Sequence, residues 1–166
     1  IEKYLKQKNY SHGCLVFLKK TEEGIKRNGA WAYTRDKLDA GDVLEILFAE
    51  EDSSENIVPV EMKLDIVYED EDILVINKPA DTPIHPSQGN YDNSLANGVK
   101  HYYESQGESF VFRCINRLDR DTTGLVVIAK NMLSSAALNA AMVNREIHRT
   151  YLAVVKGELP EKGTID

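Results

Sequence analysis

The chain has 166 residues, of which 42% are apolar and 28% are charged, and its formal net charge is −7. This size and composition are typical of a soluble globular protein with one ordinary domain or two small ones. The chain has no apolar run of roughly 18 residues, the length that a membrane-spanning helix needs, so we expect no membrane partner.

The cysteines and the first residues indicate the compartment. Cys14 and Cys114 form neither a disulfide framework nor a CxxC pair, which favours a reducing cytoplasm. The first eight residues are rich in lysine and do not resemble a signal peptide. We therefore expect a cytoplasmic protein. The four histidines show no metal-ligand spacing with the cysteines or with each other.

Charge is distributed in three blocks. Residues 1–37 carry nine Lys or Arg against four Asp or Glu, residues 49–110 carry three against fourteen, and residues 113–156 carry seven against three. Affinity for phosphate depends on where cations cluster more than on the net charge. The two basic blocks therefore leave RNA binding open, although solvated charged surfaces produce the same imbalance.

Residues 1–48 have the pattern of a small unit of helices and hairpins. After a short first helix, Ser11 is a natural N-cap for a second helix, which Gly24 would end. Asn28-Gly29 predicts a hairpin, because both central positions of a type I′ turn need a positive φ. The strands expected here are residues 25–27, 30–32 and 43–48.

The acidic run within residues 49–58 indicates a linker, and residues 59–166 then form a second unit. Residues 79–93 hold three of the five prolines and predict an exposed loop. The strands expected in this unit are residues 66–68, 73–76, 110–115, 125–129 and 151–155, and the expected helices are residues 94–103 and 131–146. Strands outnumber helices without strict alternation, which predicts an α+β fold with a mixed or antiparallel sheet.

The first unit resembles a known RNA-binding domain. Its order Ser-x-x-x-Leu, Leu-Lys-Lys, Asn-Gly and Leu-x-x-Gly-Asp-x-Leu is similar to the alpha-L domain first known from a small-subunit ribosomal protein. The resemblance implies that cations near the second helix bind RNA phosphates. The matching positions are His12, Lys19, Lys20, Lys26 and Arg27. The alternative is a small αβ module with ordinary surface lysines.

The second unit contains a charged stretch, residues 116–124, between two apolar strands. Such a local inconsistency is typical of a functional site or a tight turn. Its Arg-Leu-Asp-x-x-Thr-Thr-Gly is similar to the signature of the RluA-type pseudouridine synthases of large-subunit ribosomal RNA. Two further motifs resemble the family in the same order, namely Leu-Val-Ile-Asn-Lys-Pro with Pro-x-His-Pro-Ser upstream, and Arg-x-Tyr-Leu-Ala-x-Val-x-Gly downstream.

This resemblance implies an isomerase that converts specific uridines of structured RNA, such as ribosomal RNA, to pseudouridine without a cofactor. Asp119 matches the essential aspartate, and a carboxylate beside C1′ can assist cleavage of a glycosidic bond. Arg117 matches the residue associated with base flipping, and Tyr151 the residue that lies against the uracil. His85 is expected to contact RNA. The alternative for Arg117 is a structural role, as the partner of Asp119 or Asp121 in an ion pair.

Two departures from the family pattern change the expectation. Asn116 stands where many relatives have a histidine, so a cationic contribution to phosphate binding there is in doubt. A third family motif, near Gly-x-x-His-Gln-Ile-Arg, would follow residue 166. We therefore expect the catalytic domain to be truncated, inactive by itself and prone to self-association. A non-catalytic RNA-binding protein and an idle fragment remain as alternatives.

Overall fold

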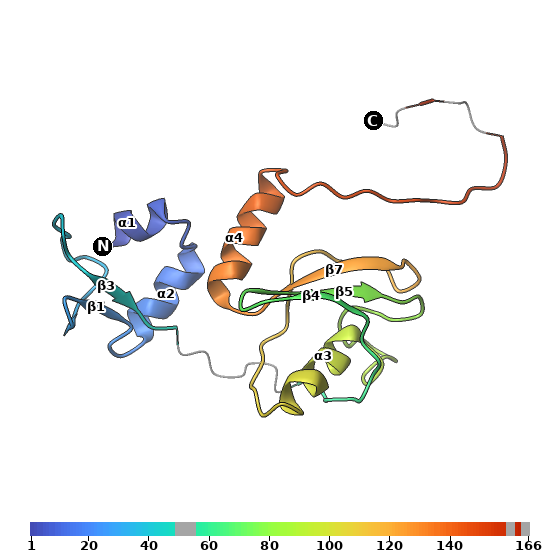
Figure 1. Ribbon diagram of the computed structural model, residues 1–166, viewed down its shortest axis with the longest axis horizontal. Coiled ribbons are helices and arrows are strands. Elements are labelled where there is room, and N and C mark those ends of the chain that lie inside the picture. Colours follow the sequence, from blue (N-terminus) through green and yellow to red (C-terminus); the bar gives the residue numbers. More distant parts are fainter. Residues whose placement is uncertain (49–55, 159–161, 164–166) are drawn as a thin grey trace.

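The computed structural model describes residues 1–48, 56–158 and 162–163 (Figure 1). The first part contains two helices, α1 (Glu2–Gln7) and α2 (His12–Lys20), followed by three short strands. The strands are β1 (Ile25–Arg27), β2 (Ala30–Trp31) and β3 (Leu44–Ile46), and they form an antiparallel sheet in the order β2-β1-β3.

Local signals explain most of this first part. The Ser11 hydroxyl accepts a hydrogen bond from the Cys14 amide at 3.2 Å and caps α2 as predicted. Asn28 and Gly29 have φ values of 53° and 79°, which is the backbone that the hairpin prediction required. The predicted end of α2 is wrong, because the helix ends at Lys20 and Thr21 is already extended. Gly24 instead allows close packing, since a Cβ there would meet the Thr21 Cβ at 2.9 Å.

The second part contains α3 (Leu95–Glu104), α4 (Met132–Val143) and a four-stranded sheet in the order β4-β5-β7-β6. Every pair in this sheet is antiparallel, which confirms the α+β expectation in its antiparallel form. The strands are β4 (Ile66–Glu69), β5 (Ile73–Lys78), β6 (Arg113–Cys114) and β7 (Gly124–Ala129). The helices that the structure describes are all too short to cross a membrane.

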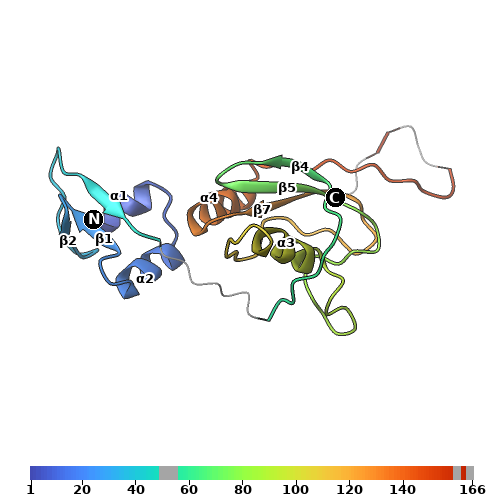
Figure 2. The ribbon, with the colours of Figure 1, turned by 60° about the horizontal axis from the view of Figure 1, so that its bottom comes forward.

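The two faces of this sheet are covered differently (Figure 2). Side chains alternate along a strand, so Leu74 and Ile76 of β5 share a face with Val126 and Ile128 of β7. These four residues are fully buried against α3, in one core cluster with its Leu95, Val99 and Tyr103. The opposite face lies toward α4, which buries none of its residues. A separate cluster within residues 1–48 forms the core of the first part.

Asn97 of α3 holds the start of the second part in place. Its buried side-chain amide donates to the carbonyls of Val58, at 2.7 Å, and Tyr91, at 3.0 Å. Its carbonyl oxygen accepts from the Ser94 amide in a capping box. Val58, at the end of the predicted linker, is therefore attached to α3, whereas residues 49–55 lie outside the described residues.

Two predicted strands differ from the structure. The strand expected over residues 110–115 is reduced to β6, because only Arg113 and Cys114 pair with β7. Residues 151–155 form no strand, and Leu152 and Val154 are 100% and 99% exposed. A β-prone sequence becomes a strand only when a neighbouring strand accepts its hydrogen bonds, and no described strand lies beside this segment.

Glu69, at the end of β4, joins three elements through its carboxylate. It accepts hydrogen bonds from the hydroxyls of Tyr102, at 2.9 Å, and Tyr103, at 2.8 Å, and from Lys130 Nζ, at 2.9 Å. Burial by itself would raise the pKa of Glu69. The hydrogen bonds from Lys130, Tyr103 and Tyr102 outweigh burial and hold this pKa below its ordinary value.

Glu69→Gln is expected to lower the free energy of unfolding at pH 7 by about 2 kcal/mol, because the three donors lose a charged acceptor. A carboxyl whose pKa is lowered by folding stabilises the protein above its unfolded pKa, and this stabilisation disappears as the pH falls through the folded pKa. The difference between the two proteins in urea unfolding should therefore shrink below about pH 4. Glu61→Gln, at an exposed position, is the control; equal losses in both variants would contradict the role of Glu69.

Candidate active site on a charged turn

The predicted catalytic stretch forms a turn between β6 and β7, which we call the charged turn (residues 116–124). Its tightest part is closed by a hydrogen bond from the Thr122 amide to the Asp119 carbonyl at 3.1 Å. Gly124 ends the turn with a φ of 125°, a conformation that other residues rarely adopt. Arg117 and Asp119 are both exposed, so the turn presents its charged side chains to solvent.

Asn116 fixes the base of the charged turn. Its side-chain nitrogen donates to the Leu125 carbonyl at 2.9 Å, and its side-chain oxygen accepts from the Val127 amide at 2.8 Å. The side-chain amide of Asn116 thus makes the two hydrogen bonds to β7 that a backbone would make if β6 continued further. In the sequence, Asn116 stands out only as a residue in place of the usual histidine. The structure shows that it also positions the charged turn.

Lys78 lies beneath the charged turn and is fully buried at the end of β5. Its Nζ donates to three backbone carbonyls, those of Pro79, Thr82 and Arg120, each at 2.8 Å. Burial lowers the pKa of Lys78, and the negative charges of Asp121 and then Asp119 oppose that change. Since an ammonium has three hydrogens and finds three acceptors here, we infer that Lys78 remains charged.

Arg120 ties the charged turn to the loop after β5. Its carbonyl accepts from the Thr82 amide at 3.2 Å as well as from Lys78. Its guanidinium forms an ion pair with Asp81, with Nε 2.6 Å from Oδ1, and Asp81 has a φ of 58°. The backbone neighbour of Asp119 is therefore held from two sides. Sequence reasoning missed Lys78 and Asp81, although a lysine inside a strand of buried residues was an available signal.

Arg117 and His85 lie near each other on one flank of the turn. The His85 ring packs edge-on against Phe112, with 5.2 Å between ring centroids. Desolvation of the ring and then the nearby Arg117 guanidinium lower the pKa of His85, so the neutral imidazole is favoured at neutral pH. Among the residues that the structure describes, Arg117 forms no ion pair with Asp119 or Asp121. The structure therefore does not support a purely structural ion pair as the role of Arg117.

Tyr151 lines a groove that begins at the charged turn. The groove, of about 490 Å³, runs between the open face of the sheet and α4. Leu118 and Thr123 of the turn border it, and Tyr151 is exposed in the segment that crosses it. Its apolar walls include Ile73, Leu125 and Val127 of the sheet and Leu138 and Met142 of α4. The structure thus places Tyr151 beside the immediate neighbours of Arg117 and Asp119.

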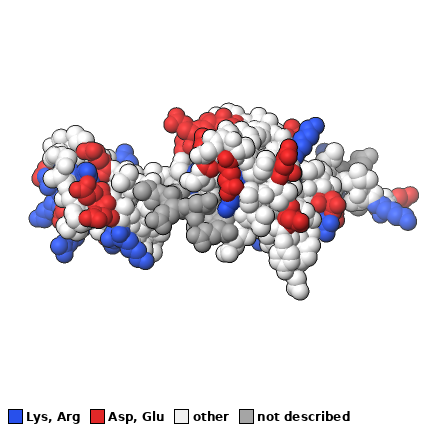
Figure 3. All heavy atoms as spheres, turned by 90° about the horizontal axis from the view of Figure 1, so that it is seen from below, with Lys and Arg blue, Asp and Glu red and all other residues white. Residues whose placement is uncertain are grey.

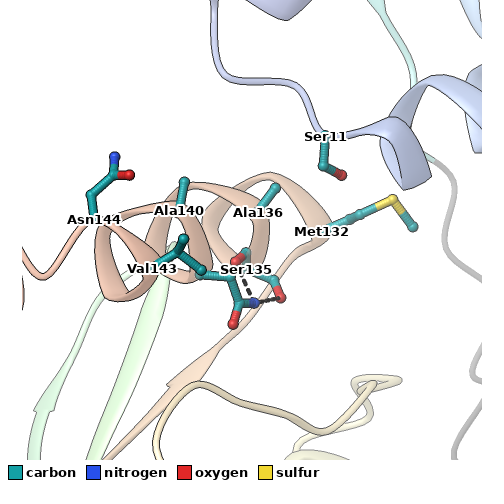
Figure 4. Close-up of a pocket in the computed structure, with 8 residues that line it drawn as sticks. Ser11, Met132, Ser135, Ala136, Ala140, Val143 and Asn144 are labelled. Carbon is teal, nitrogen blue, oxygen red and sulfur yellow. Dashed lines mark hydrogen bonds between the residues drawn. The ribbon is translucent and has the colours of Figure 1, made fainter.

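A second hollow, of about 480 Å³, lies between Ser11 and the outer side of α4 (Figure 4). It carries small and apolar side chains, including Met132, Ala136 and Val143, and no titratable group. Close to it, the Cys14 thiol faces the Met132 carbonyl at 3.9 Å, where α2 meets α4. We therefore place no chemistry in this hollow.

The predicted RNA-binding cations of the first part are mostly paired with acidic residues. Lys19 lies 3.2 Å from Glu2, Lys26 lies 2.7 Å from Glu23, and Arg27 pairs with both Asp39 and Asp42. Lys20 is exposed and has no ion pair within the part of the chain that the structure describes. Figure 3 shows the Lys and Arg side chains of this end projecting beside Asp and Glu.

Neither cysteine offers a reactive site. Both are free, and burial raises the pKa of the Cys114 thiol to about 11, with its sulfur 3.0 Å from the Asn116 carbonyl. A thiol with this pKa stays protonated at neutral pH and is a poor nucleophile. The residues that the structure describes also contain no cluster of three His, Cys, Asp or Glu side chains able to hold a metal ion.

Comparisons with known proteins identify the family of the chain. The family model of RNA pseudouridylate synthase matches residues 72–166, which include the charged turn, Lys78 and Tyr151. Ribosomal large subunit pseudouridine synthase D of Escherichia coli strain K12 is 42% identical over 118 residues, which cover 71% of this chain and 36% of that protein. An uncharacterized RNA pseudouridine synthase of Bacillus subtilis strain 168, YjbO, is 34% identical over 167 residues, covering 100% and 59%.

A solved structure, human RNA pseudouridylate synthase domain containing 1, is 26% identical, with a TM-score of 0.41 over 50% of this chain and 29% of that one. The chain belongs to the RNA pseudouridylate synthase family. Within it, the relatives named synthase D place the chain among the RluA-type enzymes. The chain spans between about a third and three fifths of the length of these curated relatives.

Lys78→Met is expected to destabilise the protein by about 2–3 kcal/mol and to loosen the charged turn, because two loop carbonyls lose a buried partner. Hydrogen–deuterium exchange read by mass spectrometry should become faster in the peptide that covers residues 116–124. Lys130→Met, which breaks the ion pair with Glu69, is the control: it should destabilise without this local effect. Unchanged protection of the charged turn in Lys78→Met would show that Lys78 does not hold it.

Proposed function

We propose that the protein isomerises uridines of RNA to pseudouridine and that Asp119 is the catalytic carboxylate. The observation that carries the proposal is the charged turn itself. It presents an exposed carboxylate on a backbone held by Lys78, Asn116 and Arg120. The residue before this carboxylate, Leu118, lines a groove that Tyr151 also lines. A carboxylate with a fixed backbone position suits a reaction that depends on attack at one sugar carbon.

The reaction needs one carboxylate because the base is rejoined rather than replaced by water. The C1′–N1 bond of uridine breaks, and the Asp119 carboxylate stabilises the electron-poor C1′ or forms a transient bond to it. The released uracil turns within the site, and a bond forms between C1′ and C5. Loss of the proton from C5 restores the aromatic ring, while N1 gains a proton, so the product is an isomer of the substrate.

Arg117 and Tyr151 would handle the base before and during this step. A uridine in structured RNA must leave its stack, and Arg117 projects from the turn where it can fill the space left behind. Tyr151 offers an exposed aromatic face beside the turn, on which the extruded uracil can stack. His85, favoured in its neutral form, would contribute a hydrogen bond to RNA rather than a charge.

The proposed substrate is ribosomal RNA, since several relatives are named ribosomal large subunit pseudouridine synthase D. Residues 1–48 would act as an alpha-L RNA-binding domain, with residues 49–58 as a linker to the catalytic domain of residues 59–166. The separate core cluster of residues 1–48 supports this division. A cytoplasmic location belongs to the same proposal, as does self-association of this chain.

Asp119→Asn in the full-length protein is expected to abolish tritium release from RNA that carries uridine labelled at C5, because the amide cannot stabilise C1′. Asp121→Asn is the matched control, since it makes the same change of charge two residues away on the same exposed turn. It should retain activity within a few fold of the wild type. Substantial tritium release by Asp119→Asn, or an equal loss in both variants, would contradict the assignment of Asp119.

Lys20→Glu is expected to weaken RNA binding severalfold at about 0.1 M salt. The slope of log affinity against log salt concentration should also become shallower, by the equivalent of roughly one phosphate contact. The reason is that Lys20 is exposed and free to contact phosphate, unlike the paired cations near it. Lys63→Glu makes the same change at an exposed site of the second part and serves as the control. Titration of fluorescent RNA at several salt concentrations measures both quantities; identical salt slopes would argue against the role of residues 1–48.

A further inference from the structure

Three outward side chains form a row at the edge of the first sheet. Along residues 31–35 exposure alternates strictly, so Trp31, Tyr33 and Arg35 face solvent while Ala32 and Thr34 are buried. Trp31 ends β2, and the chain then turns, with the Asp36 amide donating to the Tyr33 carbonyl at 2.9 Å; the three outward side chains are brought together by their own contacts. Trp31 belongs to β2, which pairs with β1 alone in this sheet and leaves the row uncovered.

The row is preorganised by contacts between its own members. The rings of Trp31 and Tyr33 stack, with centroids 5.5 Å apart and planes inclined by 30°. The Arg35 guanidinium lies over the Tyr33 ring, 5.3 Å from its centroid. Below the row, the Asp36 carboxylate accepts from the Tyr33 amide at 2.7 Å and holds the backbone in shape.

This arrangement leaves large apolar surfaces in water. Trp31 is 48% exposed and Tyr33 is 50% exposed, although the small core of residues 1–48 would gain from burying them. Burial of large apolar side chains stabilises a folded protein, so an exposed aromatic pair forgoes stabilisation that a unit of this size needs. Exposed, ordered aromatic rings are the usual surface on which unpaired nucleic acid bases stack.

Cations surround the row. Arg35 is part of it, Lys37 is exposed two residues later, and Lys20 is exposed at the end of α2. A small hollow of about 60 Å³ separates Trp31 and Tyr33 from the end of α2, with Lys19 on its rim. In the proposed complex, Arg35 and these neighbouring lysines would neutralise the phosphates next to a stacked base. The row offers stacking and charge without a fixed set of hydrogen-bond groups, so it would not select a particular base.

We propose that Trp31, Tyr33 and Arg35 form a stacking platform for an unpaired RNA nucleotide, separate from the site on the charged turn. The platform rests on the proposed function, because RNA is the ligand of both. It would hold single-stranded RNA next to the duplex that carries the target uridine. The contribution of residues 1–48 to binding is then base stacking as much as phosphate contact.

The test uses the fact that Trp31 is the sole tryptophan of the chain, so intrinsic fluorescence reports on the platform directly. A short oligouridylate added to the 166-residue chain should quench this fluorescence saturably. Inorganic polyphosphate, which has charge but no bases, and a blunt-ended RNA duplex, which has no unpaired base, should not. No quenching by the oligouridylate, or equal quenching by polyphosphate, would overturn the proposal.

Variants test the same platform by anisotropy of a labelled oligouridylate. Trp31→Ala should weaken binding about 10-fold or more, whereas Trp31→Phe, which keeps an aromatic face, should recover most of the affinity. Tyr91→Ala removes a 65% exposed tyrosine outside the row and serves as the control. Circular dichroism checks that each variant is folded.

Two results separate this proposal from others. Unchanged RNA affinity of Trp31→Ala together with weaker self-association in sedimentation would identify the row as a protein contact and overturn the platform. Tritium release by the wild type is measured in the same preparation. If release occurs while Trp31 shows no response to oligouridylate, the platform is wrong and the proposed isomerase activity stands.

Discussion

Three backbone carbonyls from two separate segments converge on the buried ammonium of Lys78. A lysine without exposed surface is unusual, and here it is tolerated because every hydrogen of the charged group has an acceptor. One acceptor is the Arg120 carbonyl, the next one along the backbone from Asp119. The position of an exposed carboxylate therefore depends on a cation inside the protein. Lys78 belongs to the rigid sheet, and its hydrogen bond to the Arg120 carbonyl fixes the charged turn to that sheet.

The antiparallel sheet is asymmetric in a way that suits this arrangement. Its face toward α3 is closed by fully buried side chains, and its face toward α4 holds the groove that Tyr151 borders. The closed face supplies stability, and the open face leaves room for a ligand next to the charged turn. Both faces come from the same strands, because alternate residues of β5 and β7 point to opposite sides.

Sequence reasoning succeeded where structure is decided locally. Ser11 caps a helix, and Asn28-Gly29 makes a hairpin, because each depends on residues within one turn. It failed for residues 151–155, since a strand also needs a partner that sequence patterns do not reveal. The roles of Arg117, Asp119 and Tyr151 come from the family resemblance and remain predictions; in the structure Tyr151 shares a groove with Leu118, which lies between the other two residues.

The anchoring contacts escaped sequence reasoning for a physical reason. Lys78 acts on Arg120, 42 positions away, and Asn116 acts across the turn on Leu125 and Val127, 9 and 11 positions away. The same distance problem affects charge: the cations of residues 1–48 were counted as free, but Glu2 and Asp39 approach two of them across the fold. Net charge by segment overestimates the positive potential wherever such pairs form.

The double hydrogen bond of Asn116 to β7 has a consequence for how this family of sequences can vary in length. Because one side chain spans the Leu125 carbonyl and the Val127 amide, the number of residues between Asn116 and Leu125 is set by geometry. An insertion there would lift the amide from both partners. The loop around Gly89 is less constrained at its tip: residues 87–89 are exposed, a short bridge joins Ser87 and Asn90, and the Asn97 amide holds the loop only at its end, through the Tyr91 carbonyl. Insertions and deletions should therefore accumulate in that loop and avoid the charged turn.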